Sequence, residues 1–290
     1  MVYEKPRYRP VGECRLLVEL SDQVELVANL KAITLAKQLM QVCPLGPSGI
    51  EAIVDLIPSF NTVLIEYEPT LLTQQGLIAV CNYAFRQLAT QSDIEVISRL
   101  IEIPVTYNDR WFRACFEHYC QTIKPIEDNL ELVCRLNGLT SVQALIDHHT
   151  KTEWWVGAVG FVAGLPTLMP LDTNYRLHAP KYDPPRTWTP KGTIGIGGGF
   201  TTIYPVVIPD GYQMVGRTPV PIFDAAGRLS PFKDHPLLFR VGDRVKFKSI
   251  SEEEFEAIEY EIADRRYKFS ISAPEKFPLN RYLKPDLLKA

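Results

Sequence analysis

The chain has 290 residues, of which 46% are hydrophobic and 22% charged, and its formal net charge is -3. This composition is ordinary for a globular protein, and the length allows two domains with separate cores. This net charge does not indicate a protein that binds nucleic acid or an anionic membrane. No apolar run is long enough to span a bilayer. The N-terminus carries no export signal and the six cysteines are scattered, so we expect a cytoplasmic protein.

Residues 1–107 alternate between strand and helix patterns. The strands are predicted at about 14–20, 50–56, 63–67 and 95–105, and a helical pattern follows the first and the third of them. This β-α-β-β-α-β order is that of a ferredoxin-like domain. We therefore predict a ferredoxin-like α+β domain over residues 1–107, with the proline- and charge-rich segment 1–12 lying over another part of the protein.

Residues 108–150 read as an aromatic insert followed by a helical connector. Cys115, His118 and Cys120 lie among the aromatic residues, but a structural zinc site needs a fourth ligand and none is visible nearby. We therefore predict that no metal binds here. The last helix of this segment carries His148 and His149 in its final turn, where a histidine often only interacts with the helix dipole.

From residue 151 onward the pattern is nearly all β. Short strands with glycine and proline turns predict a closed barrel or a sandwich over residues 151–250. Gly195, Gly197, Gly198 and Gly199 are dense enough to let a backbone approach a ligand or another backbone closely. No helix pattern follows them and no GK[ST] ending is present, so they are neither a dinucleotide fingerprint nor a P-loop.

A final helix is predicted to begin near Ser251, with Glu252 to Glu254 as favourable charges in its first turn. The proline-punctuated tail that follows either wraps a partner subunit or is a loose end. Residues 251–290 are therefore expected to form a C-terminal helix and tail.

The second half resembles a known family in a series of short motifs that occur in order and at matching spacing. It is similar to KipI-like proteins, which include allophanate hydrolase subunit 1, the B subunit of 5-oxoprolinase and half of the carboxyltransferase domain of urea carboxylase. The motifs are His149-Thr150, Gly160-Phe161, Pro185-Arg186, Pro190-x-Gly192, the run from Ile196 to Pro205, Pro209-x-Gly211, Gly216-Arg217-Thr218-Pro219 and Gly242-Asp243-x-Val245-x-Phe247.

The resemblance implies a ferredoxin-like domain followed by a cyclophilin-like β-barrel, and an active site at the junction with a KipA-like second subunit. It also implies biotin on a partner carrier, together with a biotin carboxylase subunit, or ATP on a partner subunit; this chain itself is expected to bind no cofactor. One departure is Phe200, which stands where the family often has glutamine. A phenyl ring makes that position more apolar, which would alter recognition of a small polar amide.

Three functions fit this resemblance. The first is a subunit of a heteromeric carboxyltransferase, inactive alone, that transfers a carboxyl group from biotin to a small amide-, urea- or carbonyl-type substrate. The second is a component of an ATP-dependent cyclic-amide hydrolase, of the type of the 5-oxoprolinase B subunit, with a LamB-type partner. The third is a non-catalytic inhibitor of a histidine kinase. We expect the first.

Carboxyl transfer needs donors that hold a carboxylate and a group that moves a proton. Arg186 and Arg217 are the candidate anion clamps, although either could instead be a buried structural brace. His149 is the candidate general base. The candidate hydroxyls are Tyr204 and Thr202, beside Gly198 and Gly199 in the proposed substrate-binding loop; Tyr204 could also simply fill the barrel.

Overall fold

The computed structural model describes residues 2–42, 52–90, 96–277 and 282, and these divide into two units. The first unit contains the described residues up to Ser98 and those from Pro274 onward, and the second unit is Arg99–Ala273. The first unit consists of β1 (Val2–Pro10), β2 (Arg15–Ser21), α1 (Leu26–Val42), β3 (Ile53–Ser59), β4 (Thr62–Tyr67), α2 (Gln74–Thr90), β5 (Ile97–Ser98) and β15 (Glu275–Lys276).

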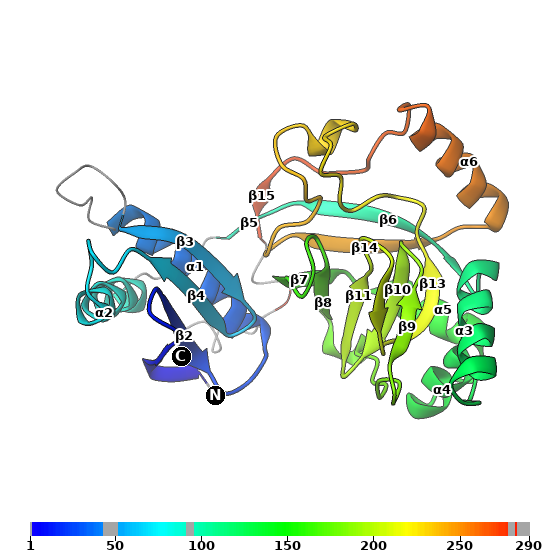
Figure 1. The fold of residues 1–290 in the computed structure, drawn as a ribbon, viewed down its shortest axis with the longest axis horizontal. Coiled ribbons are helices and arrows are strands. Elements are labelled where there is room, and N and C mark those ends of the chain that lie inside the picture. The colour runs from blue at the N-terminus through cyan, green and yellow to red at the C-terminus, as the bar shows by residue number, and fades with distance from the viewer. Residues whose placement is uncertain (1, 43–51, 91–95, 278–281, 283–290) are drawn as a thin grey trace. The chain divides into compact units, whose positions relative to one another are not determined.

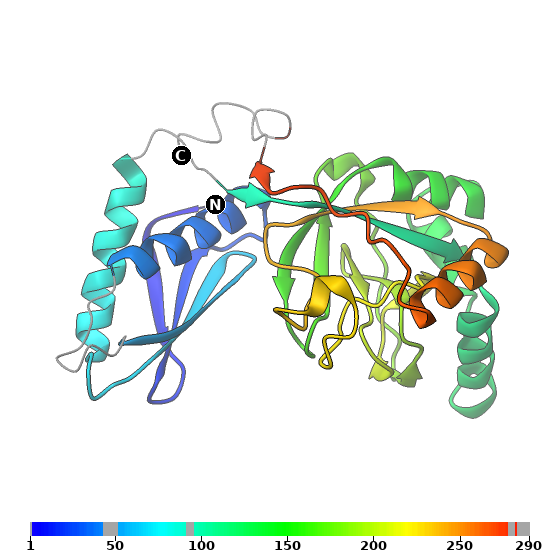
Figure 2. The same cartoon turned by 90° about the horizontal axis from the view of Figure 1, so that it is seen from above.

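The first unit is built on a four-stranded antiparallel sheet in the order β1-β2-β4-β3, and α1 and α2 pack together on one face of it (Figure 2). Alternation explains this layer: Leu16, Val18 and Leu20 on β2 are fully buried and form a core with Val63 and Ile65 on β4. Period-2 alternation places one set of side chains under the helices.

The predicted fourth strand of this sheet is wrong. The predicted segment 95–105 contains β5, which pairs with β15, and most of β6 (Leu100–Tyr107), which belongs to the second unit. The N-terminal segment, expected to lie over another part of the protein, instead forms β1 and pairs with β2. β1 thus occupies the sheet edge beside the first predicted strand.

The second unit contains a closed barrel of seven strands in the order β10-β11-β8-β7-β14-β6-β13 (Figure 1). β6 and β14 pair in parallel, whereas the barrel pairs β10–β11, β10–β13, β11–β8, β13–β6, β14–β7 and β7–β8 are antiparallel. The strands are β6, β7 (Trp154–Val159), β8 (Pro166–Pro170), β10 (Thr193–Gly197), β11 (Phe200–Ile203), β13 (Gln213–Arg217) and β14 (Arg244–Ser249), while β9 (Arg186–Thr189) and β12 (Ile208–Asp210) form a separate ribbon. The fold is α+β, and the barrel is consistent with the expected cyclophilin-like architecture.

Four helices accompany the barrel: α3 (Arg110–Thr122), α4 (Asn129–Leu136), α5 (Val142–Lys151) and α6 (Glu252–Ala263), with short 3-10 turns at Thr173–Tyr175 and Ser230–Phe232. The predicted start of the last helix is confirmed: Ser251 and Glu254 form a capping box at the N-terminus of α6. The predicted helical connector is present as α4 and α5, and the aromatic insert forms α3. Side chains of α3 to α5 join the barrel strands in one hydrophobic core.

The expected boundary after residue 107 differs from the division of the structure, which falls after Ser98. The reason is that β6 pairs with β13 and β14, so it belongs to the barrel. The described part of the C-terminal tail pairs with strands of this chain. Glu102 N donates to Ser270 O, Ser272 N donates to Leu100 O, and β15 pairs with β5. This segment covers an edge of β6 that would otherwise be unpaired.

Candidate functional site

His149, the predicted general base, lies in the last turn of α5 and is 0% exposed. Its Nδ1 lies 2.7 Å from the hydroxyl oxygen of Tyr107, and its ring stacks on Phe247 at 4.5 Å between centroids. Burial lowers the pKa of His149 to about 3, and the neighbouring His148 adds to this shift. The imidazole is therefore neutral and enclosed by its own chain, in contact with the hydroxyl of Tyr107 rather than with a cavity.

Tyr204, the second predicted catalytic residue, is also 0% exposed and follows β11. Its ring lies directly against the backbone of Gly195, where a Cβ would come within 3.0 Å of it. Burial raises the pKa of Tyr204, and the nearby carboxylate of Asp210 adds to this. Its hydroxyl forms no hydrogen bond of normal geometry within the described residues. The ring therefore fills the barrel, and glycine at 195 is what makes room for it.

Arg186 is 1% exposed, and its guanidinium is occupied by its own chain. Nη1 donates to the carbonyl of Tyr212 at 2.7 Å, while Nε and Nη2 donate to the hydroxyl of Thr189. The guanidinium also lies over the ring of Tyr182 at 4.4 Å. These contacts are those of a structural brace between β9 and the segment before β13.

Thr202 and the glycine pair have local structural roles in this geometry. The hydroxyl of Thr202 donates to the carbonyl of Pro166 at 2.8 Å, across to β8. Gly198 and Gly199 have φ of 60° and 97° and form the two-residue loop between the paired residues Gly197 and Phe200. Positive φ at both positions is what a type I′ hairpin turn needs, which explains the glycines.

Arg217, another predicted site residue, lies at the end of β13 and lines a cavity of about 260 Å³. Its side chain is 11% exposed, and its guanidinium lies 4.5 Å from the Trp111 ring and 5.0 Å from the Phe255 ring. Nε donates to the carbonyl of Lys191 at 3.2 Å. The aromatic rings hold the guanidinium in a fixed plane, so its orientation is set before any ligand arrives.

A second nitrogen of Arg217, Nη1, faces Asp109. Nη1 lies 3.9 Å from Asp109 Oδ1, too far for a hydrogen bond, and it has no other partner within the described residues. Asp109 is 0% exposed and caps α3 by accepting from Trp111 N and Phe112 N, while its Oδ2 is unpaired among those residues. Burial lowers the pKa of Arg217 and raises that of Asp109. The two side chains thus form a loose buried ion pair in which neither Arg217 Nη1 nor Asp109 Oδ2 makes a hydrogen bond with the described residues.

Arg217 lines a cavity of about 260 Å³. A second cavity, of about 250 Å³, shares with it the lining residues Lys191, Pro221, Ile262 and Ala263. We call the two together the Lys191 groove. It runs between the C-terminal half of α6 and the segment 217–229. Sequence reasoning missed its contributors Lys191 and Glu259, as well as Asp109, Trp111 and Phe255, which hold Arg217. The one signal in the sequence was Asp109, a helix-capping residue two positions before Trp111.

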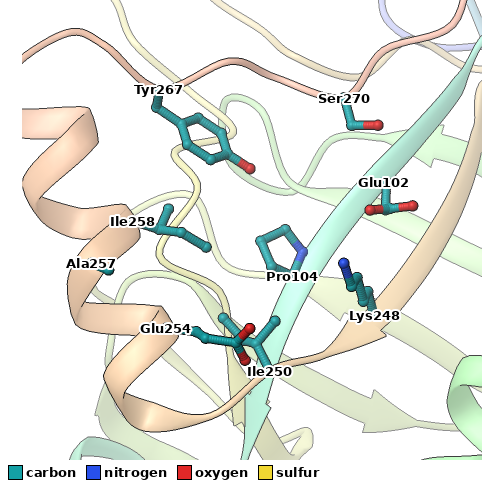
Figure 3. A pocket seen from close by; sticks show the side chains of 9 residues that line it. All are labelled: Glu102, Pro104, Lys248, Ile250, Glu254, Ala257, Ile258, Tyr267 and Ser270. Carbon is teal, nitrogen blue, oxygen red and sulfur yellow. The ribbon is translucent and has the colours of Figure 1, made fainter.

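A third cavity, of about 270 Å³, lies on the outer side of β6 and β14 beneath α6 (Figure 3). Glu102 and Lys248 extend from the two strands, Glu254 comes from α6, and Tyr267 lies on the returning C-terminal segment. None of the predicted site residues lines this cavity.

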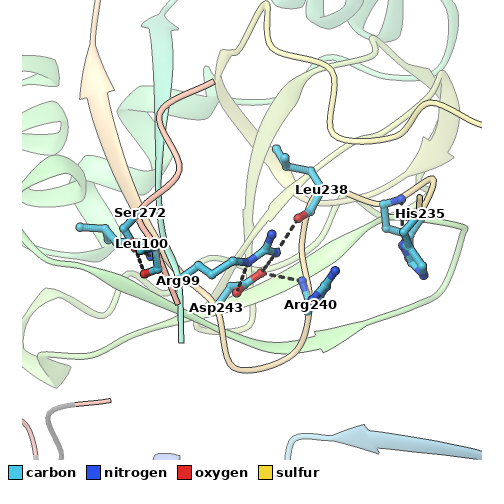
Figure 4. A network of polar contacts seen from close by, with 9 residues as sticks. Arg99, Leu100, His235, Leu238, Arg240, Asp243 and Ser272 are labelled. Atoms are coloured by element: carbon cyan, nitrogen blue, oxygen red, sulfur yellow. Dashed lines mark hydrogen bonds and ion pairs between the residues drawn. The ribbon is translucent and has the colours of Figure 1, made fainter. Parts of the chain in front are cut away.

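The Gly242-Asp243 motif has a structural role in this geometry. Arg99 donates to both oxygens of Asp243, at 3.0 and 2.5 Å, and to the carbonyl of Leu238 (Figure 4). The backbone N of Arg240 donates to Asp243 as well. Asp243 thereby joins the residue before β6 to the turn before β14.

The predicted site residues thus fall into separate places. His149 lies with Tyr107 and Thr201, Arg186 lies near Tyr204, and Arg217 lies on the Lys191 groove. Within the described residues, no group of three or more metal-ligating side chains is found; Cys115 and His118 both contact Trp188 instead. Nor does any helix in the described ranges combine the length and apolar character needed to cross a bilayer.

Comparison with known proteins shows extended similarity. Residues 6–232 match the family model described as carboxyltransferase domain, subdomain C and D. The chain is 30% identical over 274 residues to urea amidolyase of Saccharomyces cerevisiae, covering 91% of this chain but 14% of that protein. It is 29% identical to the 5-oxoprolinase B subunit of Bacillus subtilis, covering 84% of this chain and 90% of that relative.

The crystal structure of Kluyveromyces lactis urea carboxylase superposes with a TM-score of 0.82 at 26% identity. The match covers 97% of this chain and 25% of the urea carboxylase chain. The chain therefore spans a quarter or less of these urea amidolyase and urea carboxylase chains, and 90% of the 5-oxoprolinase B subunit.

Proposed function

Because the chain belongs to the carboxyltransferase domain family, subdomains C and D, we propose that it is one subunit of a heteromeric carboxyltransferase. In this proposal a KipA-like second chain completes the site, and the complex transfers a carboxyl group from biotin to a small amide-, urea- or carbonyl-type substrate. Biotin is carried by a partner chain, and this chain binds no cofactor itself. Support comes from the urea carboxylase superposition, which extends over 97% of the chain.

The observation that carries a site assignment is the position of Arg217. Of the seven residues predicted from the sequence, Arg217 lines a cavity of about 260 Å³, and its Nη1 makes no hydrogen bond with any described residue. In the proposal its guanidinium holds a carboxylate through a charge-assisted hydrogen bond. His149 is neutral and buried, so the partner chain supplies the group that moves the proton, and His149 positions Tyr107 on β6.

The second candidate function is a component of an ATP-dependent cyclic-amide hydrolase, of the type of the 5-oxoprolinase B subunit. In it the complex uses ATP to open a cyclic amide. The specific observation in its favour is that the match covers 90% of the Bacillus subtilis relative. The first candidate needs biotin on a partner chain, whereas the second needs ATP on a partner subunit.

The experiment is to purify the native complex and to assay it with urea and with 5-oxoproline, each with ATP and bicarbonate. Carboxylation of urea that avidin abolishes supports the first candidate, because avidin sequesters biotin. Avidin-insensitive, ATP-dependent opening of 5-oxoproline would replace it with the second. A complex active on neither substrate class, but able to inhibit a histidine kinase, would contradict both.

A further inference from the structure

The Lys191 groove carries an unusual set of charges for a chain with a formal net charge of -3. Four cationic side chains line it, namely Lys191, Arg217, Arg228 and Arg265, against two acidic ones, Glu259 and Asp224. The net charge of the lining is therefore two positive. Lys191 and Arg265 are exposed and form no ion pair with the described residues, so their charge is available to a ligand.

The charges are divided between the two ends of the groove. Arg217 and Glu259 line one cavity, while Arg228, Arg265 and Asp224 line the other. Lys191 lines both, and the shared wall between them is apolar, formed by Pro221, Ile262 and Ala263. Asp224 is occupied by its own turn, because it accepts from the backbone N of Arg228 and from the Arg228 guanidinium.

We propose that the Lys191 groove binds a small organic dicarboxylate, with one carboxylate at Arg217 and the other at Arg265. This inference deepens the proposed function, on which its assignment of the Arg217 end rests. The guanidinium of Arg217, which lines the first cavity and is held by the rings of Trp111 and Phe255, supplies the fixed positive charge at one end. The apolar wall accommodates the carbon chain between the two carboxylates, since apolar contact in the middle of a groove and charge at its ends match such a molecule.

Carboxylate fits this lining better than phosphate. Each end contains an acidic residue beside its cations, so a group with a single negative charge balances an end without excess repulsion. A dicarboxylate supplies two negative charges in all, which equals the net positive charge of the lining.

The test is isothermal titration calorimetry of the full chain with glutarate, propionate and inorganic phosphate at low ionic strength, where exposed charges are least screened. Glutarate is expected to bind at one site per chain and more tightly than either other probe. Arg265→Gln should weaken glutarate binding by about two- to fivefold, as for an exposed ion pair. Arg217→Lys should weaken it by about tenfold, because a buried charge-assisted bond is lost.

Arg266→Gln is the matched control. Arg266 neighbours Arg265 but pairs with Asp264 and does not line the groove, so this variant should bind glutarate as the native chain does. Arg265 is exposed, so its substitution tests the groove even where Arg217→Lys fails to fold. Propionate or phosphate binding as tightly as glutarate, or an unchanged affinity in Arg265→Gln, would overturn the proposal.

The proposed function and this inference can fail separately. A complex that loses carboxyl transfer in Arg217→Lys while the chain binds no glutarate refutes the dicarboxylate and leaves the carboxyltransferase intact. A chain that binds glutarate through Arg265, within a complex that transfers no carboxyl group, refutes the proposed function and retains the groove.

Discussion

At the scale of single residues, burial separates two arginines that look alike in the sequence. Arg186 and Arg217 each follow or precede a proline motif in a β-rich segment, and both were predicted as anion clamps. All three nitrogens of the Arg186 guanidinium donate to the chain itself. Arg217 lines a groove, and its Nη1 makes no hydrogen bond with the described residues. The same side chain is therefore a brace at one position and a candidate ligand-binding group at the other.

Arg217→Lys is expected to lower kcat/KM of the reconstituted complex by about ten- to a hundredfold. The reason is that lysine cannot reproduce the planar donor fork, and a charge-assisted bond contributes about 1.5 to 3 kcal/mol. Steady-state kinetics with thermal melting of the same samples measure this. Arg186→Lys is the matched control and should lower the melting temperature while activity per folded molecule stays normal. Unchanged turnover in Arg217→Lys with reduced stability would remove Arg217 from the site.

His149 makes the stability of the fold depend on pH. Its folded-state pKa is about 3, below the ordinary 6.5, so the unfolded chain binds a proton there that the folded chain does not. Stability is therefore unaffected by this group above about pH 6.5 and falls as the pH drops from there towards 3. In His149→Gln, the free energy of unfolding should fall by about 2 kcal/mol less than in the native chain between pH 7 and pH 5.

Urea denaturation across this pH range measures the effect. Tyr107→Phe is the control, because it removes the hydroxyl beside Nδ1 and leaves the titrating imidazole in place. It should lower stability at every pH while keeping the slope of the native chain. Parallel curves for the native chain and His149→Gln would show that His149 is protonated alike in both states.

At the scale of elements, the glycine-rich stretch is explained by turns and close packing. Gly198 and Gly199 form the hairpin between β10 and β11, and Gly195 leaves space for Tyr204. The density of glycines correctly indicated a backbone that other groups approach closely. The neighbours that the structure shows are protein side chains: a Cβ at Gly199 would meet the His178 ring at 3.0 Å.

Gly199→Ala should destabilise the protein more than Gly198→Ala. Both residues have positive φ, which costs a residue with a Cβ about 1 kcal/mol, but only Gly199 also faces a neighbour that must move. Thermal melting of the two variants measures the difference. If the loop binds substrate instead, both variants would raise KM in the complex at unchanged melting temperature.

At the scale of the whole molecule, the chain resembles one part of a larger catalytic unit. The structure places the predicted catalytic side chains His149 and Tyr204 in the interior, and the lining of the Lys191 groove offers cations but no histidine. The family model covers subdomains C and D of a carboxyltransferase domain, and the chain covers 14% of the Saccharomyces cerevisiae relative. These facts agree with a site completed by another polypeptide.

We therefore expect the isolated chain to be inactive and to purify from its source as a heteromer with a KipA-like chain. Affinity purification under native conditions, with mass spectrometry of the subunits, checks this expectation. Activity should appear only when the second chain is added back. A single purified chain that turns over substrate at the rate of the cell extract would contradict it.

Local patterns alone determined much of the second unit and of the first helical layer. The start of α6 near Ser251 was predicted from the acidic residues Glu252 to Glu254, because charges in the first turn act on the helix end beside them. The strand that begins at Val245 was predicted after the turn at Gly242-Asp243, and the short strands with glycine and proline turns indicated a barrel or a sandwich. These signals lie within a few residues of the elements they specify.

Only the tertiary structure decided which strands pair and which polar residues are accessible. Alternating apolar residues of β6 could pack in either sheet, and its partners β13 and β14 lie more than a hundred residues away. The contacts of Arg217 with Asp109, Trp111 and Phe255 likewise join segments that are distant in the sequence. Strand pairing and burial depend on contacts between distant segments, and a residue's own neighbours in the sequence carry no record of them.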